Sequence, residues 1–181
     1  MERIVITGMG CVCPLGNDVP SFWNNLITGR SGIAPITKID TAGLRNENGG
    51  EVKNFDWSAY GEEGDCDEAS QFAFAAAHEA LADAQLSDAD LRGAGLVFST
   101  NFGGAASWET VCEMAREGAV DAELFRQFTL EDAAEYSARQ LNIAGPRVTL
   151  SNACSSGGNA IGLAADWLRL GRCERVLCGG H

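Results

Sequence analysis

Cys154 is the residue of this 181-residue chain whose neighbours best suit covalent chemistry. It follows residues 148–151, a run that predicts a buried strand, and it precedes a small-residue segment that predicts a helix. A cysteine at a helix N-terminus has its thiolate stabilised by the partial positive charge there. Backbone N–H groups of the same turn can hold a developing oxyanion, so this strand–turn–helix segment predicts a nucleophile.

The residues beside Cys154 favour a reactive role over a structural one. Most cysteines are buried packing residues, and composition alone supports that interpretation. Asn152 before the cysteine and Ser155 after it are instead small and polar. A purely structural site would more often carry large apolar residues at these positions.

The other cysteines predict reduced thiols and no metal centre. The chain has seven cysteines, an odd number, which suits a reducing compartment better than a disulfide framework. Cys11 and Cys13 are separated by one residue. No second Cys or His pair with ligand spacing accompanies them, so we expect no zinc site and no cofactor.

Strands and helices are expected to alternate along the chain, which predicts an α/β fold with a mainly parallel sheet. Apolar runs predict strands at residues 3–7, 95–100, 147–151 and 175–178. Periodicity and capping residues, including Thr129 as an N-cap, predict helices at 18–27, 70–84, 105–117, 129–141 and 155–170. Residues 28–66 predict an irregular surface excursion.

The segment 155–170 predicts a helix that is buried on all sides. Its only charged residues are Asp166 and Arg169, and small residues occur all around it. A helix that is apolar all round belongs in the centre of a layered protein. Gly171 suits the residue that ends such a helix.

Composition excludes some classes of function. The net charge is −12, which argues against a nucleic-acid surface. No apolar stretch approaches the roughly 18–20 residues of a membrane helix, and no targeting segment is visible. We therefore expect a cytoplasmic protein with no membrane insertion.

Five segments match one enzyme family in order and spacing. They are I-V-I-T-G-M-G-C-V-C-P-L-G-N, F-A-F-A-A-A-H-E-A-L-A-D-A, S-T-N-F-G-G, S-N-A-C-S-S-G-G-N-A-I-G-L-A and V-L-C-G-G. Together they resemble the β-ketoacyl synthases, the condensing enzymes of fatty acid and polyketide synthesis. The resemblance covers nearly the whole chain, so residues 1–181 are identified as an N-terminal domain of this family.

The resemblance implies a thiolase-like fold, layered α/β/α/β/α, of which this chain is the N-terminal half with a mixed sheet and a buried central helix. It implies that Cys154 takes an acyl group from an acyl-carrier protein or coenzyme A thioester. A malonyl thioester is then decarboxylated, and its carbanion attacks the acyl group. Phe102, Gly103, Asn152 and Ser155 are expected to bind substrate. A homodimer or heterodimer is expected, joined across the strand near 147–151.

The chain departs from the family in its length. Members have about twice as many residues, and their two catalytic histidines and a supporting lysine lie in the second half. His78 and His181 match neither catalytic histidine, and we expect His78 to be a surface or packing residue. Without the second half, the helix 155–170 is expected to be exposed on one side and to need a partner segment. The chain therefore reads as incomplete at its C-terminus or as one part of a split protein, inactive alone in condensation.

Two further departures concern recognition. Residues 61–68 are acidic, whereas the family carries basic residues there that help to dock the acidic carrier protein, so we expect altered docking rather than only a solvated loop. Phe102 replaces a residue that is often isoleucine near the floor of the acyl pocket. It predicts a restricted acyl substrate, unless Phe102 simply packs in the core.

Other functions remain open. A cysteine hydrolase would need a base within reach of Cys154, and the chain has only two histidines. A non-catalytic subunit that acts through protein–protein contacts is a second alternative. The glycines at 8 and 10 follow a predicted strand, but the third glycine of a dinucleotide fingerprint is missing.

Overall fold

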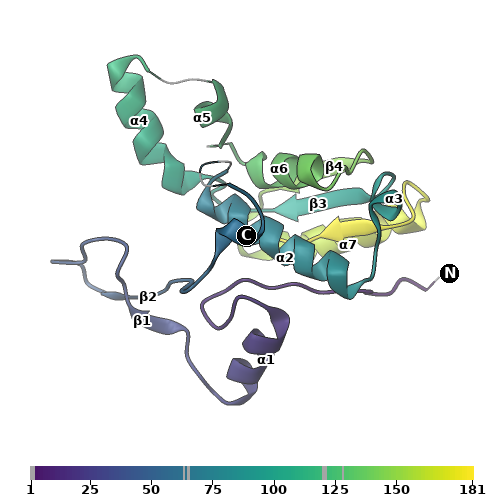
Figure 1. The fold of residues 1–181 in the computed structure, drawn as a ribbon, viewed down its shortest axis with the longest axis horizontal. Coiled ribbons are helices and arrows are strands. Elements are labelled where there is room, and N and C mark those ends of the chain that lie inside the picture. The colour runs from purple at the N-terminus through teal and green to yellow at the C-terminus, as the bar shows by residue number, and fades with distance from the viewer. Residues whose placement is uncertain (1–2, 63, 65, 120–121, 128) are drawn as a thin grey trace.

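A three-stranded parallel sheet forms the centre of the molecule (Figure 1). The computed structural model describes residues 3–62, 64, 66–119, 122–127 and 129–181. The central strand β3 (Gly95–Ser99) pairs with β4 (Arg147–Leu150) on one side and with β5 (Val176–Cys178) on the other. Three of the four predicted strands are thus confirmed, and their parallel order places all three carboxyl ends at one edge.

The strand β3 is buried on both faces, as expected for the centre of a parallel sheet. Leu96 and Phe98 belong to one hydrophobic cluster, whereas Val97 belongs to another. Successive side chains of a strand point to opposite faces, so these two clusters lie on opposite sides of the sheet.

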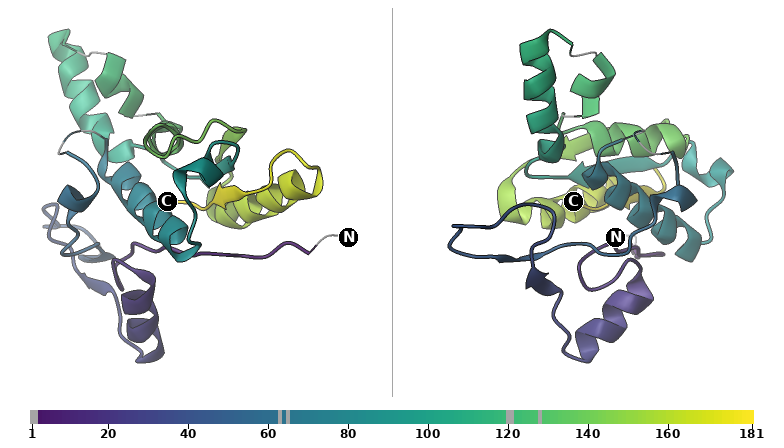
Figure 2. Two further views of the ribbon diagram at one scale, coloured as in Figure 1. Left: turned by 45° about the vertical axis from the view of Figure 1, so that its right-hand side comes forward. Right: turned by 60° about the vertical axis from the view of Figure 1, so that its left-hand side comes forward.

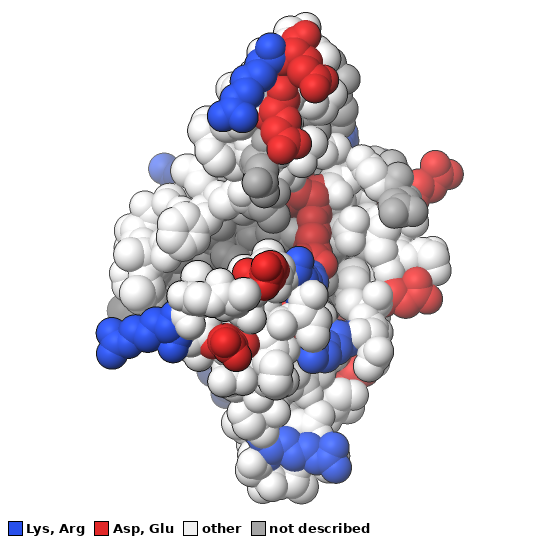
Figure 3. All heavy atoms as spheres, turned by 90° about the vertical axis from the view of Figure 1, so that its left-hand side faces the viewer, with Lys and Arg blue, Asp and Glu red and all other residues white. Residues whose placement is uncertain are grey.

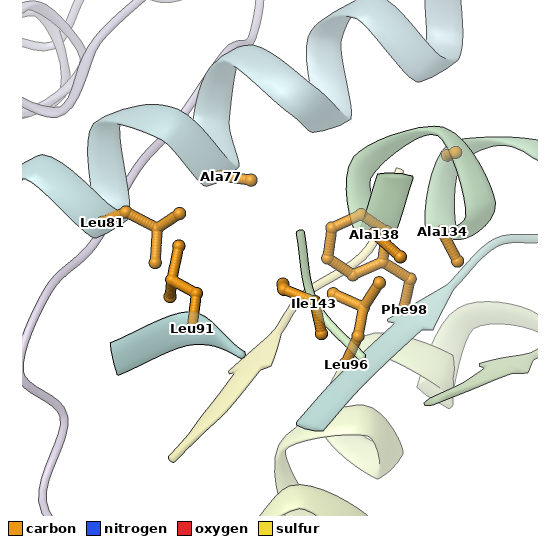
Figure 4. Packing of buried hydrophobic residues seen from close by; sticks show 9 residues of the cluster. Ala77, Leu81, Leu91, Leu96, Phe98, Ala134, Ala138 and Ile143 are labelled. Atoms are coloured by element: carbon orange, nitrogen blue, oxygen red, sulfur yellow. The ribbon is translucent and has the colours of Figure 1, made fainter. Parts of the chain in front are cut away.

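Three helices cover the first face. They are α2 (Glu68–Asp83), α3 (Asp88–Leu91) and α6 (Asp132–Gln140). Figure 4 shows Ala77 and Leu81 of α2, Leu91 of α3 and Ala138 of α6 gathered around β3. Alanines on α2 and α6 allow these two helices to approach closely, which accounts for the small-residue pattern of residues 72–84.

The helix α7 (Ser156–Arg169) covers the second face of the sheet with only one of its sides. Its buried residues are Ser156, Ala160, Ala164 and Trp167. The opposite side is open: Ile161 is 56% exposed. The sheet lies on one side of α7 and no described element covers the other. Burial all round requires the second half of the family fold, so this exposed side is the one expected of the helix 155–170 in the N-terminal half alone.

Residues 3–7 do not join the sheet, contrary to the prediction of a strand there. They run extended, and Ile6 is 78% exposed. A cavity of about 1100 Å³ separates this segment from residues 173–177, which include the first two residues of β5. A strand needs a neighbour for its hydrogen bonds, and residues 3–7 have none among the described strands.

The N-terminal segment is held along α2 instead. The N–H of Met9 donates to Asp83 (3.0 Å) and the N–H of Cys11 donates to Glu79 (2.9 Å). A Cβ on Gly10 would lie 1.8 Å from the carbonyl oxygen of Ala76. Glycine is therefore required there by the close approach of two backbones.

The excursion 28–66 is more ordered than its composition suggests. It follows α1 (Val19–Ile27) and contains the antiparallel pair β1 (Ile33–Pro35) and β2 (Asn48–Gly50), then the 3-10 turn η1 (Trp57–Ala59). Trp57 is buried against Phe74 and Tyr136. The prediction of a wholly irregular surface segment is wrong here, because isolated aromatic residues anchor it to the core.

The segment between β3 and α6 projects from the body (Figures 1 and 2). It comprises the 3-10 turn η2 (Ala105–Ser107), α4 (Trp108–Glu117) and α5 (Ala122–Gln127). Thr129 was expected to cap the next helix. Instead its hydroxyl donates to the carbonyl of Arg126 (2.9 Å), and Glu131 is the N-cap residue of α6.

Candidate functional site

Cys154 lies at the junction of β4 and α7. It occupies the middle of a 3-10 turn, η3 (Ala153–Ser155), which leads directly into α7. The seven cysteines are all free, and Cys154 is the exposed one, whereas Cys66 is buried and the others are half-buried. The predicted strand–turn–helix placement of this thiol is confirmed, and the thiol is open to an incoming reactant.

Ala153 gives the turn its shape. Its φ of +59° lies in the left-handed region, which a non-glycine residue adopts at a cost of about 1–2 kcal/mol. Such strain at a residue adjoining a candidate nucleophile is a frequent feature of functional sites. The sequence gives no sign of it, because alanine has no preference for this conformation.

Asn152 and Ser155 close around Cys154. The Nδ2 of Asn152 donates to the Ser155 hydroxyl (3.1 Å), and that hydroxyl donates to the carbonyl of Asn152 (3.1 Å). Two of the predicted substrate-binding residues are therefore brought together, on either side of the cysteine. This pairing fixes the turn without using the thiol.

Phe102 and Gly103 follow the neighbouring strand β3 at the same edge of the sheet. Gly103 has φ +53°, and its N–H donates to the Thr100 hydroxyl (3.0 Å). Phe102 is 75% exposed, so the alternative that it packs in the core is wrong. Ligands of open α/β sheets bind beyond the carboxyl ends of the strands, which is where these residues and Cys154 lie.

Neither histidine is placed beside Cys154. His78 is exposed on α2, and its ring packs edge-on against Tyr60, with centroids 5.6 Å apart. This confirms its expected role as a surface packing residue. His181 follows β5, and its backbone N–H donates to Ser99 (3.0 Å). Because β3 lies between β5 and β4, His181 is two strands away from the cysteine.

Some residues of the acidic stretch 61–68 stabilise the fold. Glu63 and Asp65 lie outside the described residues, but Asp67 is buried and caps α2 by accepting the N–H of Ser70 (2.8 Å). The sequence holds the signal for this cap, an aspartate directly before the first helical residue. Glu68 forms an ion pair with Lys38, a basic residue outside the stretch. The interpretation as a wholly solvated loop is therefore wrong.

A buried polar contact holds the base of the projecting helices, and sequence reasoning missed it. Asp132 at the start of α6 is 2% exposed. It accepts a hydrogen bond from the Ser70 hydroxyl (2.9 Å) and pairs with Arg126 of α5. Through these two contacts the Asp132 carboxylate links α2, α5 and α6.

The charges of the surface are scattered. On the face in Figure 3 the lysine and arginine side chains lie in several separate places, with acidic groups among them. The described residues contain no cluster of three or more His, Cys, Asp or Glu side chains able to hold a metal ion. No helix in the described ranges is long and apolar enough to cross a membrane.

Comparison with known proteins gives a consistent result. A sequence model described as "Beta-ketoacyl synthase, N-terminal domain" matches residues 1–181. The chain is 30% identical to the 3-oxoacyl-[acyl-carrier-protein] synthase 2 of Synechocystis sp. over 99% of its own length and 45% of that relative. The chain thus spans about half the length of the curated relatives it matches.

Solved structures give the same relationship. The chain superposes with a TM-score of 0.88 on the ishigamide ketosynthase/chain length factor, at 31% identity, covering 99% of this chain and 47% of the other. It superposes with a TM-score of 0.82, at 27% identity, on a type II PKS ketosynthase solved with its acyl-carrier protein, covering 99% of this chain and 45% of the other. The α/β fold observed here is accordingly that of the ketosynthases.

Proposed function

The chain belongs to the β-ketoacyl synthase family, and on that basis we propose that it carries the acyl-accepting half of a condensing active site. The observation that supports this most directly is the exposed thiol of Cys154 at the start of α7. The strained residue before it and the Asn152–Ser155 pair around it hold that thiol at the carboxyl edge of the sheet. We expect the reaction to take place in the cytoplasm.

In the proposed reaction, Cys154 first exchanges one thioester for another. Its thiolate attacks the carbonyl of an acyl-carrier-protein or coenzyme A thioester, and the carrier thiol leaves with the proton. A malonyl thioester then loses carbon dioxide, and the resulting carbanion attacks the acyl-cysteine. The new carbon–carbon bond releases the Cys154 thiolate and yields a β-ketoacyl thioester, without a cofactor.

We propose that a second half supplies the groups which assist decarboxylation. Neither His78 nor His181 lies beside the cysteine, so the described chain offers no histidine for that step. The open side of α7 and the cavity between residues 3–8 and β5 are both surfaces that a further domain can cover. The chain alone is therefore expected to accept an acyl group but not to condense it.

Acylation is tested on the chain itself. Trypsin cuts after Arg147 and Arg169, so the peptide 148–169 contains Cys154 as its single cysteine. Mass spectrometry after incubation with an acyl thioester should find the acyl group on this peptide, and the Cys154→Ser variant should carry none. An unmodified peptide under conditions that acylate a full-length relative would refute the proposal.

Condensation is tested with and without a second half. With a radiolabelled malonyl thioester, residues 1–181 alone should give no β-keto product, whereas co-expression with a matching C-terminal half should restore it. If the C-terminal half binds residues 1–181 but no β-keto product forms, the alternative of a non-catalytic or split subunit is favoured. Release of free acid from an acyl thioester by the chain alone would favour the cysteine hydrolase.

The exposed edge of the sheet indicates where a second subunit could bind. The strand β4 is an edge strand of the described sheet, so we propose that a homodimer or heterodimer forms across it.

The acidic residues of 61–68 repel an acidic carrier protein. We therefore propose docking through another surface or through a basic partner subunit. Tight carrier binding that is lost on neutralising Glu62 and Glu68 would contradict this.

Phe102 is proposed to restrict the acyl chain. Its ring is free of the core and lies at the same sheet edge as Cys154, so it can occupy space that a longer acyl chain needs. In a complete enzyme, Phe102→Ala should lengthen the accepted chains. An unchanged chain-length profile, measured by competition between acyl thioesters, would count against this role.

A further inference from the structure

Asn48, at the start of β2, is the one asparagine of the chain that a glycine follows. An asparagine side chain loses ammonia when the backbone nitrogen of the next residue attacks its carboxamide carbon. Most residues place a Cβ beside that nitrogen, whereas Gly49 leaves it open and lets the backbone rotate towards the attacking geometry. The sequence therefore marks Asn48 as the asparagine most open to this reaction.

The carboxamide of Asn48 is accessible and is not held in place. Asn48 is exposed. Its backbone N–H donates to Oδ1 of Asn46 (3.1 Å), and its carbonyl accepts from Nδ2 of Asn46 (2.8 Å). Both bonds use the backbone of Asn48, and its own carboxamide makes no hydrogen bond with any described residue. The electrophile is thus free to meet the nitrogen of Gly49.

The strand pairing holds that nitrogen back. The register places Gly49 opposite Ala34, and the N–H of Ile36 donates to the carbonyl of Glu47 (2.9 Å). Hydrogen-bonded pairs alternate along an antiparallel ladder, so the Ala34–Gly49 pair is the next bonded one and engages the N–H of Gly49. The reaction therefore requires β1 and β2 to separate locally. An isolated pair of short strands does so readily.

We propose that Asn48 is a modification site, at which water alone converts the asparagine to aspartate or isoaspartate. The backbone nitrogen of Gly49 attacks Cγ of Asn48, the carboxamide C–N bond breaks, and ammonia leaves with the proton of Gly49. One water then opens the five-membered imide at either of its carbonyls. One opening yields aspartate, and the other yields isoaspartate, in which the main chain runs through the former side chain. One water is consumed for each ammonia released.

Isoaspartate at position 48 should disturb the contacts of Glu51. The Glu51 carboxylate accepts the N–H groups of Thr37 and Lys38, both at 2.9 Å, and so ties the residue after β2 to residues that follow β1. Isoaspartate adds one carbon atom to the main chain between positions 48 and 49. The longer path shifts Gly49 out of register and moves Glu51 away from its two donors. The modification should therefore loosen this part of the segment 28–66.

The first test is to age the folded chain at mildly alkaline pH. Trypsin cuts after Arg45 and Lys53, so the peptide 46–53 contains Asn48 together with Asn46 as an internal reference. Mass spectrometry should find conversion at Asn48 and not at Asn46, and electron-transfer fragmentation should identify the isoaspartate. Asn48→Gln should remove the conversion. An unmodified Asn48 in the folded chain, after a time that converts it fully in urea, would overturn the proposal.

The second test asks whether the strand pair controls the rate. Conversion in urea should be at least about tenfold faster than in the folded chain, because no ladder has to open. Glu51→Ala should speed conversion in the folded chain and leave the rate in urea unchanged. Glu113→Ala on α4 is the matched control and should alter neither rate. Equal rates in the folded and the urea-treated chain would contradict control by β1 and β2.

Hydrogen exchange measures the consequence. In the aged chain the amides of Thr37 and Lys38 should lose protection, whereas in aged Asn48→Gln they should keep it. Protection that is unchanged in a fully converted sample would show that the modification leaves the contacts of Glu51 intact. Circular dichroism of each variant checks that it is folded.

Discussion

At the scale of single residues, the turn before the nucleophile depends on Ala153. A β-branched side chain is disfavoured in the left-handed region far more than alanine, whereas glycine adopts it freely. Ala153→Val should therefore lower the free energy of unfolding by about 1–2 kcal/mol, measured by urea denaturation. Ala153→Gly is the matched control and should change it by less than about 1 kcal/mol. Equal stability of the two variants would show that the turn is not constrained at this residue.

The carboxylate of Glu51 makes the stability of the segment 28–66 depend on pH. Its carboxylate accepts hydrogen bonds from the N–H groups of Thr37 and Lys38, both 2.9 Å, and from the Thr37 hydroxyl. These bonds lower the pKa of Glu51 in the folded chain. The stabilisation is therefore complete above the ordinary glutamate pKa and is lost as the pH falls through the lowered value.

The matching experiment compares the chain with its Glu51→Gln variant across pH. The parent should be the more stable of the two near neutral pH, and the difference should shrink as the pH falls into the acid range. Urea unfolding at each pH measures it. A stability difference that stays constant with pH would contradict a role for the ionised carboxylate.

At the scale of elements, the segments predicted best are those that a local sequence pattern defines. The runs at 95–100 and 175–178 became β3 and β5, and the segment ending at Gly171 became α7, because periodicity and capping are local properties. Sheet membership is not local, which is why residues 3–7 are extended but unpaired. Isolated aromatic residues such as Trp57 carry no periodicity, so its burial could not be predicted from the pattern around it.

The candidate site was predictable to a similar extent. Cys154, Asn152 and Ser155 are close in sequence, so their grouping followed from the turn itself. The side-chain contact between Ser70 and Asp132 joins residues 62 positions apart, and no local pattern indicates it. The alignment of the β3 and β4 carboxyl ends was predictable only through the expectation of parallel strands.

The attachment of the N-terminal segment to α2 can be tested at Gly10. A Cβ there would collide with the Ala76 carbonyl, so Gly10→Ala should separate the segment from the helix. The amides of Met9 and Cys11, which bond to Asp83 and Glu79, should then lose protection in hydrogen exchange.

The expected cost of this change is about 1–3 kcal/mol of stability, as for other overpacked contacts. Gly93→Ala is the control, because a Cβ at Gly93 meets no atom within 4 Å. It should leave both amides protected. Retained protection in Gly10→Ala would mean that the segment does not lie against α2 in solution.

At the scale of the whole molecule, helices cover one face of the sheet closely, whereas the helix α7 on the other face has an uncovered side. The face covered by α2, α3 and α6 holds the largest hydrophobic cluster (Figure 4). The open side of α7 instead carries glycines with nothing within 4 Å, including Gly158 and Gly162. Glycine inside a helix costs about 0.5–1 kcal/mol relative to alanine, so their presence on an exposed side calls for a reason. We infer that they leave room for a second backbone.

The substitution Gly162→Ala is expected to have opposite effects in the isolated chain and in the assembled protein. In the isolated chain it should raise the free energy of unfolding by about 0.5–1 kcal/mol, since alanine favours the helix and meets no neighbour. With a matching C-terminal half, the same change should weaken association and lower condensation activity, because the added methyl group occupies the space of the second backbone. Gly93→Ala, which is equally open but is not part of α7, should leave association unchanged. A Gly162→Ala variant that is more stable alone and equally active when assembled would show that the second half does not pack on this side of α7.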